Sequence, residues 1–108
     1  MTLNDYQFKA AQTAIYPKMG LIEGAMYCAL KLNGEAGEVA ELVGKTFRGD
    51  YSEVPREKVL KELGDVLWYV SQLANEMSIN LEEIAQTNLD KLADRAERGV
   101  LKGSGSDR

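Results

Sequence analysis

Apolar side chains recur three and four positions apart along most of the chain, a spacing that places them on one face of an α-helix. No alternating run of Val, Ile or Thr residues suggests a strand, so the chain is expected to be all-α. The first helix is expected to end where Tyr16 precedes Pro17, because a residue before proline disfavours helical geometry. The pattern predicts four helices, at about residues 3–15, 23–47, 55–77 and 81–96.

Local signals mark where these helices begin. Thr2 and Asp5 have the spacing of a capping box, in which each side chain bonds the other residue's backbone N–H. Pro55 suits the first turn of the third helix, since its missing N–H has no partner there in any case. Asn80 and Glu83 form a second predicted cap, at the start of the fourth helix.

The length of 108 residues is enough for one modest core and too short for two ordinary domains. We therefore predict a single all-α domain over residues 1–98. Residues 99–108 are rich in Gly and Ser and carry little apolar surface, so we predict a flexible tail.

Composition excludes several classes of function. The net charge of −4 provides no global basic field for duplex nucleic acid or an anionic membrane, and no apolar run is long enough to span a bilayer. The single cysteine, Cys28, cannot form an internal disulfide, which favours a cytoplasmic setting. The absence of histidine removes Ser/His/Asp and Cys/His catalysis and most zinc sites. An enzyme of this composition is expected to use carboxylates and a hard cation.

An acidic motif occurs twice. Glu35 and Glu38 lie three residues apart on the second predicted helix, and Glu62 and Asp65 repeat the spacing 27 residues later on the third. Within each pair the side chains are separated by about 60° around the helix axis, so they share one surface. Both pairs lie at similar angles beside the apolar stripe of their helix. If the two helices pack side by side, four carboxylates converge at the edge of the core.

Converging carboxylates repel one another and raise one another's pKa unless a cation lies between them. Oxygen ligands favour Mg²⁺ or Mn²⁺, so we predict a divalent metal site at these four residues. The alternative is that acidic pairs at this spacing are merely solvated. The glycine inside each motif argues against it, because a mid-helix glycine costs about 1 kcal/mol. Glu41 is expected to be a bystander or to act from outside the ligand set, and Glu76 to be exposed rather than a further ligand.

The fourth predicted helix carries complementary chemistry. Asn88 falls within its apolar stripe, and Lys91 and Arg95 lie near the same line. Two cations and an amide facing a carboxylate-bound metal would suit a polyphosphate, whose charge needs neutralising away from the metal. The alternative is a core hydrogen bond for Asn88 and snorkelling side chains for the two cations.

These motifs resemble those of the MazG-like nucleoside triphosphate pyrophosphohydrolases, in the all-α NTP pyrophosphatase superfamily. The likeness covers essentially the whole chain, with the acidic pairs lying inside Leu-Asn-Gly-Glu-Ala-Gly-Glu-Val and Lys-Glu-Leu-Gly-Asp-Val-Leu-Trp-Tyr. It implies a four-helix bundle-like MazG-type fold and an assembly of dimers or tetramers, in which one site can take residues from more than one chain. It also implies Mg²⁺-dependent hydrolysis of a nucleoside triphosphate to the monophosphate and pyrophosphate, often as nucleotide-pool house-cleaning.

The resemblance also assigns roles to residues. Glu35, Glu38, Glu62 and Asp65 match the metal-binding acids, and Asn88, Lys91 and Arg95 match the nucleotide-contacting positions. We expect Glu38 to take a proton from the attacking water or to orient it.

Other possibilities stay open at this level. Trp68, Tyr69 and Tyr16 are candidates to stack on a nucleobase, and equally candidates for core or interface positions. A related activity on phosphoribosyl-ATP, dUTP or dCTP is one alternative function. A non-catalytic helical module that binds a partner protein is another, although it leaves the doubled carboxylates unexplained.

Overall fold

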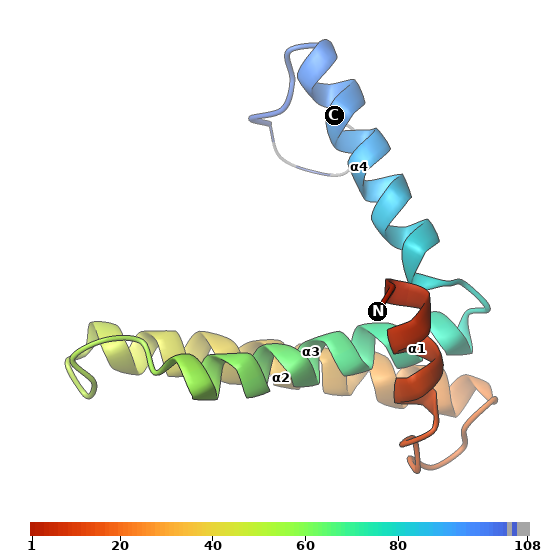
Figure 1. Cartoon of the computed structure of the whole chain (residues 1–108), viewed down its shortest axis with the longest axis horizontal. Helices are drawn as coiled ribbons and strands as arrows, with labels where there is room; N and C mark the ends of the chain where they lie inside the picture. The colour runs from red at the N-terminus through yellow and green to blue at the C-terminus, as the bar shows by residue number, and fades with distance from the viewer. Residues whose placement is uncertain (104, 106–108) are drawn as a thin grey trace.

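The computed structural model describes residues 1–103 and 105, and within them every regular element is an α-helix (Figure 1). The all-α class predicted from the sequence is therefore confirmed. The predicted flexibility of the tail falls partly on residues 104 and 106–108, which lie outside the described residues. The four helices are α1 (Leu3–Ala11), α2 (Ile22–Phe47), α3 (Arg56–Glu76) and α4 (Leu81–Glu97).

Helix α1 begins as predicted and ends a turn early. The Thr2 hydroxyl accepts the Asp5 N–H and the Asp5 carboxylate accepts the Thr2 N–H, both at 3.0 Å, which completes the capping box. The helix was expected to continue to Ile15, but it ends at Ala11. The Thr13 hydroxyl and N–H both donate to the Ala10 carbonyl, at 2.7 and 3.0 Å, and this tighter turn closes the helix before the proline exerts its effect.

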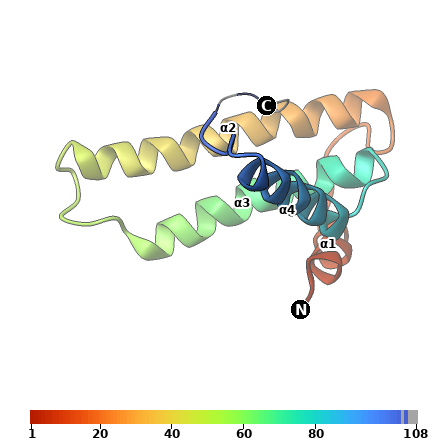
Figure 2. The same ribbon diagram turned by 90° about the horizontal axis from the view of Figure 1, so that it is seen from above.

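Helices α2 and α3 form a long antiparallel pair that lies side by side in two perpendicular views (Figure 2). The turn between them includes Gly49, whose φ of +91° lies in the left-handed region that favours glycine. Pro55 is the residue before α3 rather than a member of its first turn. The prediction was therefore wrong by one position, with little consequence, because the fixed φ of proline also suits a residue that leads into a helix.

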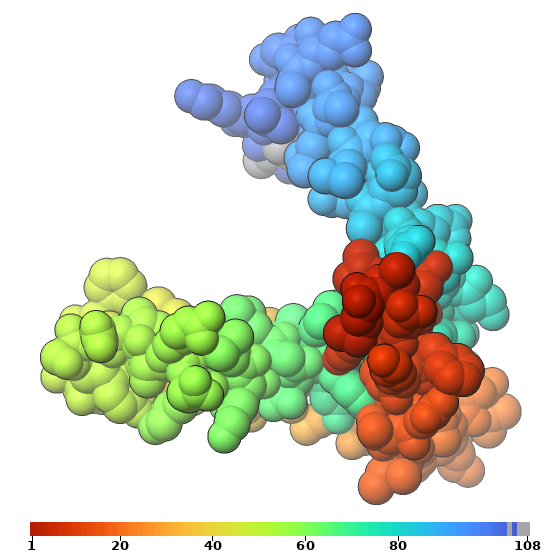
Figure 3. All heavy atoms as spheres, viewed as in Figure 1, coloured from red at the N-terminus to blue at the C-terminus, as the bar shows by residue number. Residues whose placement is uncertain are grey.

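Helix α4 does not pack along the α2–α3 pair. It contacts α1 near its own start and then extends away as a separate arm, visible in both ribbon and space-filling views (Figures 1 and 3). One chain therefore does not close into the bundle-like arrangement expected from the sequence. The periodicity predicts an apolar face on α4 but does not say which surface covers it, and among the described helices α1 packs on its start alone.

A single chain has a small core and much uncovered apolar surface. Six apolar residues are buried among those described: Ala10, Tyr16, Cys28, Leu42, Ala74 and Leu81. In contrast Phe47 is 88% exposed and Leu89, in the predicted stripe of α4, is 60% exposed. The radius of gyration is 16.5 Å, against about 13 Å for a compact domain of this length. Among the described helices none is long and apolar enough to cross a membrane.

Candidate metal centre

The two acidic pairs face each other across the α2–α3 interface. Glu35 and Glu38 come from α2, and Glu62 and Asp65 come from the antiparallel stretch of α3. One carboxylate oxygen each from Glu35, Glu62 and Asp65 lie within 4.8 Å of one another. Glu38 interacts with both Glu35 and Glu62, so all four acidic residues form one cluster. The convergence expected from the repeated motif is present, because both pairs occupy matching positions on helices that pack together.

Two carboxylate oxygens of this cluster are buried without a partner. The side chain of Glu35 is 13% exposed, and its Oε2 atom is buried and makes no hydrogen bond. The Oε2 atom of Glu62 is also buried and makes no hydrogen bond. Lys31, one turn before Glu35 on α2, comes within only 3.9 Å of the other Glu35 oxygen. A buried polar atom without a partner costs about 1–3 kcal/mol, and more when it is charged. A cation bound at the cluster would remove this cost.

The electrostatics of the cluster point in the same direction. Burial raises the pKa of the Glu35 carboxyl, and the neighbouring charges of Glu38 and Asp65 raise it further. Burial also raises the pKa of Glu62, followed by its interactions with Glu38 and Asp65. The donors are all carboxylate oxygens, which hard divalent cations such as Mg²⁺ and Mn²⁺ prefer. The residues present therefore fit such a cation.

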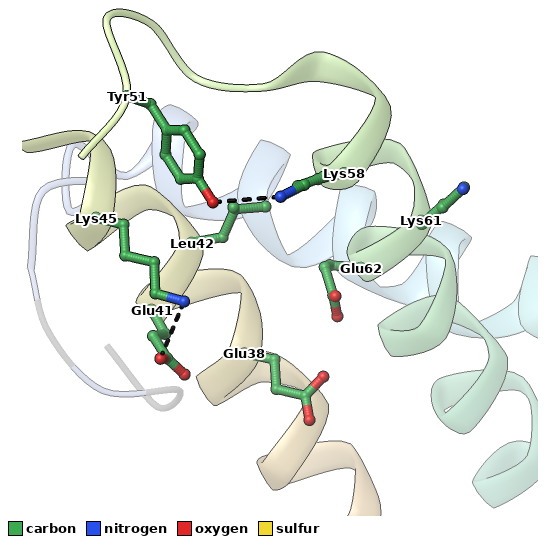
Figure 4. Close-up of a pocket in the computed structure, with 8 residues that line it drawn as sticks. All are labelled: Glu38, Glu41, Leu42, Lys45, Tyr51, Lys58, Lys61 and Glu62. Atoms are coloured by element: carbon green, nitrogen blue, oxygen red, sulfur yellow. Dashed lines mark hydrogen bonds and ion pairs between the residues drawn. The ribbon is translucent and has the colours of Figure 1, made fainter.

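A cavity of about 410 Å³ opens beside Glu38 and Glu62, toward the α2–α3 turn (Figure 4). Basic side chains line it on both helices: Lys45 on α2 and Lys58 and Lys61 on α3. Sequence reasoning missed these lysines, although two of them lie within one turn of Glu62. Tyr51, from the turn itself, was missed as well. The cavity joins positive charge to the carboxylate cluster, an arrangement that suits a phosphorylated ligand.

Two of the three lysines make contacts inside this cavity. Lys58 Nζ donates to the Tyr51 hydroxyl at 3.3 Å and lies 5.2 Å from the centre of the Tyr51 ring. Lys45 forms an ion pair of 3.5 Å with Glu41, one turn away on α2. The prediction that Glu41 is a bystander to the metal cluster agrees with this pairing.

On the opposite side of the cluster, Thr13, Trp68 and Tyr69 join Glu35 and Asp65 around a second hollow of about 320 Å³. The Trp68 indole N–H donates to the Thr13 hydroxyl at 2.8 Å, which fixes the ring. Burial raises the pKa of Tyr69 to about 12, so this phenol stays neutral at physiological pH.

Tyr16, the third aromatic candidate, is buried in the core. Its ring stacks on Tyr27 with centroids 5.7 Å apart and meets the edge of Trp68 at 6.3 Å. The structure therefore supports the core alternative for Tyr16 and leaves Trp68 and Tyr69 beside the carboxylates.

The predicted substrate residues of α4 do not reach the cluster within one chain. Asn88 and Lys91 are exposed and line a separate hollow of about 380 Å³ on α4, while Arg95 is buried, with 4% exposure. Because α4 points away from the α2–α3 pair, one chain does not bring Asn88, Lys91 and Arg95 to its own carboxylates, and their contact with the nucleotide stays a prediction (Figure 1).

Glu76 has a structural role that the sequence did not indicate. Its carboxylate accepts hydrogen bonds from the Tyr16 hydroxyl and, at 3.0 Å, from the Gly20 N–H. The expectation that Glu76 is simply exposed is therefore wrong: the residue is half-buried and holds the α1–α2 connection against α3.

Comparison with known proteins adds two findings. The family model of the MazG nucleotide pyrophosphohydrolase domain matches residues 26–100, a range that contains both acidic pairs and all of α4. The chain is also 46% identical over 114 aligned positions to the "Gene 37 protein" of Mycobacterium phage L5, with all of both chains covered. No solved structure matches the chain.

Proposed function

We propose that this chain, which belongs to the MazG nucleotide pyrophosphohydrolase domain family, hydrolyses a nucleoside triphosphate to the nucleoside monophosphate and pyrophosphate. The observation that carries the proposal is the pair of buried carboxylate oxygens without partners, on Glu35 and Glu62, beside a cavity lined by lysines. Family membership supports the reaction class, and these residues supply the chemistry that it needs.

Glu35, Glu38, Glu62 and Asp65 would hold Mg²⁺, or alternatively Mn²⁺. When bound, the cation supplies Lewis-acid polarisation of phosphate oxygens and lowers the charge that the protein must neutralise. The four side chains come from two helices that pack directly on each other, so the ligand set is held on rigid elements.

The position of the other side chains around the cluster gives each a role in the reaction. Glu38 is exposed at the edge of the cluster, where it can accept a proton from an attacking water, whereas Glu35 is largely buried. Lys45, Lys58 and Lys61 neutralise negative charge on the phosphates that lie beyond Glu62. Trp68 and Tyr69 lie on the opposite side of the carboxylates, where an aromatic ring can stack on the nucleobase.

The active form is a homodimer or homotetramer in which α4 completes the site of a second copy: Asn88 and Lys91 are exposed for this role, whereas Arg95, 4% exposed in one chain, joins them only when the residues that cover it move. Two apolar residues of the α4 stripe support this assembly, because Ile84 is 39% and Leu89 60% exposed in one chain. Gly37 and Gly64 support it too: a Cβ at either position would meet no atom within 4 Å, so nothing inside one chain explains them.

The test of the reaction is a panel of ribo- and deoxyribonucleoside triphosphates, with phosphoribosyl-ATP included, incubated with Mg²⁺ and resolved by ³¹P NMR. We expect equal amounts of monophosphate and pyrophosphate and no free orthophosphate. Preference for dUTP, dCTP or phosphoribosyl-ATP would assign the related activity instead. No hydrolysis of any compound would favour the non-catalytic helical module.

The test of the shared site mixes two defective variants. Lys91→Met keeps most of the apolar stem and deletes the charge, so we expect KM to rise about tenfold with the melting temperature unchanged. When it is refolded together with Asp65→Asn, activity should exceed the sum of the two separate variants, because some sites then receive an intact set from both copies. Two Asp65→Asn preparations refolded together are the control and should show no recovery.

A further inference from the structure

The side chain of Gln7, on α1, lies where three helices meet. It is 7% exposed, and its amide is fully used. Gln7 Nε2 donates to Asn75 Oδ1 of α3 at 2.7 Å and to the Ile79 carbonyl in the α3–α4 turn at 2.9 Å. Gln7 Oε1 accepts the N–H of Leu81, the first residue of α4, at 2.8 Å. One amide therefore connects α1 to the end of α3 and to the start of α4.

The first turn of α4 is bonded mainly by side chains of another helix. The first N–H groups of any helix lack partners within it. In α4 the Leu81 N–H goes to Gln7 and the Glu82 N–H to Asn4 Oδ1, at 3.1 Å, so α1 supplies both acceptors. Of the first three N–H groups, that of Glu83 is bonded locally, by the Asn80 side chain at 2.8 Å. The two bonds from α1 tie the start of α4 to another helix, whereas the bond from Asn80 lies within the cap of α4 itself.

The bonds of Gln7 continue into a chain of polar side chains that reaches the α1–α2 connection. Asn75 Nδ2 donates to Gln72 Oε1 at 2.9 Å, and Gln72 Nε2 donates to the Tyr16 hydroxyl at 3.3 Å. Gln7 and Gln72 are 7% and 2% exposed, whereas Asn75, which joins them, is exposed, so protein encloses the two glutamines only. The two buried amides have one preferred arrangement, since a shift leaves a buried group unpaired.

We infer that Gln7 is a positioning residue, which sets the direction of α4 and through it the place where Asn88, Lys91 and Arg95 meet the substrate. This inference rests on the proposed function, in which those three side chains bind the nucleotide. Gln7 itself touches neither the carboxylate cluster nor the lysine-lined cavity. Gln7 lies at the start of α4, so a change there affects the whole helix. A small rotation of the helix axis displaces Arg95, four turns later, by several times the displacement of the first turn.

The test compares Gln7→Met with Asn80→Ala. Methionine preserves the length of the side chain and removes all three hydrogen bonds of Gln7. The Asn80→Ala variant removes a cap of the same helix, with a comparable loss of thermal stability, and leaves the bonds from α1 intact. For Gln7→Met we expect KM for the triphosphate to rise on the order of tenfold, as expected for misplaced binding groups, with kcat reduced less. Asn80→Ala should leave KM unchanged.

A structural readout keeps this test separate from the test of the reaction. Nitroxide labels on Ala40→Cys in α2 and Ala93→Cys in α4 report the α2–α4 distance by pulsed electron resonance, with labelled chains diluted in unlabelled protein. Cys28 is fully buried and stays in place. We expect a narrow distribution for the parent and for Asn80→Ala, and a broad one for Gln7→Met. Mn²⁺ affinity should be the same in all three, since the carboxylates lie on other helices.

Two outcomes would overturn the inference: an unchanged distance distribution in Gln7→Met, or a broadened one with KM unaltered. Absence of hydrolysis by the parent protein would instead refute the proposed function, and the distance measurement would still decide whether Gln7 directs α4. If Gln7→Met does not fold, Asn4→Ala removes only the Glu82 bond and should change KM and the distance distribution in the same direction, by a smaller amount.

Discussion

Two regions of this chain enclose polar side chains, and they differ in whether those side chains bond one another. At the junction of α1, α3 and α4, which consists of Gln7, Tyr16, Gln72, Asn75 and Glu76, the amides, the phenol and the carboxylate are mutually bonded. In the carboxylate cluster of α2 and α3, buried oxygens of two residues have no partner.

The difference separates a polar cluster that builds structure from one that binds a ligand. Folded proteins contain few buried polar atoms without a partner, because each such atom lowers the free energy of unfolding. Where the chain supplies the partners itself, as around Gln7, the cluster holds helices together. Where it places carboxylates together instead, as in the cluster of α2 and α3, the proposed function assigns the missing partner to a bound cation. The following predictions test this contrast, from the largest expected effect to the smallest.

Glu38→Gln and Asp65→Asn should each reduce kcat at least 100-fold while leaving helicity unchanged, because they remove one charge from the cation-binding set. The melting temperature of the metal-free protein should stay level or rise, since one repulsion is relieved. Steady-state kinetics and circular dichroism measure both. Activity retained in both variants would exclude the assignment of this cluster as the active centre. Glu23→Gln, in the first turn of α2 and outside both the cluster and the lysine-lined cavity, is the control and should keep its activity.

Mn²⁺ at about 100 times its dissociation constant should stabilise the parent chain by about 2.7 kcal/mol, or roughly 10 °C in melting temperature. The reason is that the cation binds the folded cluster and not the unfolded chain. Differential scanning calorimetry with and without EDTA measures the shift. Glu35→Gln should lose most of it, whereas Glu41→Gln should keep it. An equal shift in all three proteins would mean that the ion binds elsewhere.

Tyr16→Phe should lower the free energy of unfolding by about 1–2 kcal/mol, because it leaves Gln72 and Glu76 without their shared partner. Urea denaturation followed by circular dichroism measures this loss. Mn²⁺ affinity should not change, in contrast to the variants of the carboxylate cluster. A drop in metal affinity equal to that of Glu35→Gln would show that the junction and the cluster are not separate.

The smallest expected effect is on the pH dependence of stability. In EDTA the raised pKa values of Glu35 and Glu62 mean that the folded chain holds protons more tightly than the unfolded chain does. The free energy of unfolding should therefore fall as pH rises above the ordinary glutamate value near 4.5 and through the raised values.

With saturating Mn²⁺ this trend should reverse, because metal binding requires ionised carboxylates. A double variant, Glu35→Gln with Glu62→Gln, should show neither trend. Urea denaturation at several pH values measures both, and a parent chain in EDTA that gains stability over this range would contradict the directions given for the two pKa values.

Much of the carboxylate cluster could be predicted from the sequence because its geometry is local. Residues three apart on a helix share a surface whatever else the chain does, so the repeated motif alone placed two acidic pairs at matching angles. The capping box of Thr2 and the cap at Asn80 are local in the same sense, and both were predicted correctly. The number and type of the helices followed from periodicity.

The junction and the course of α4 could not be predicted in this way, because they depend on contacts between distant residues. Gln7 bonds groups 68 to 74 positions away, and nothing in the sequence around Gln7 distinguishes it from an exposed glutamine. The same holds for Glu76, which bonds the Gly20 N–H 56 positions earlier. Sequence periodicity determines which face of α4 is apolar; only tertiary hydrogen bonds at its first turn decide where that face points.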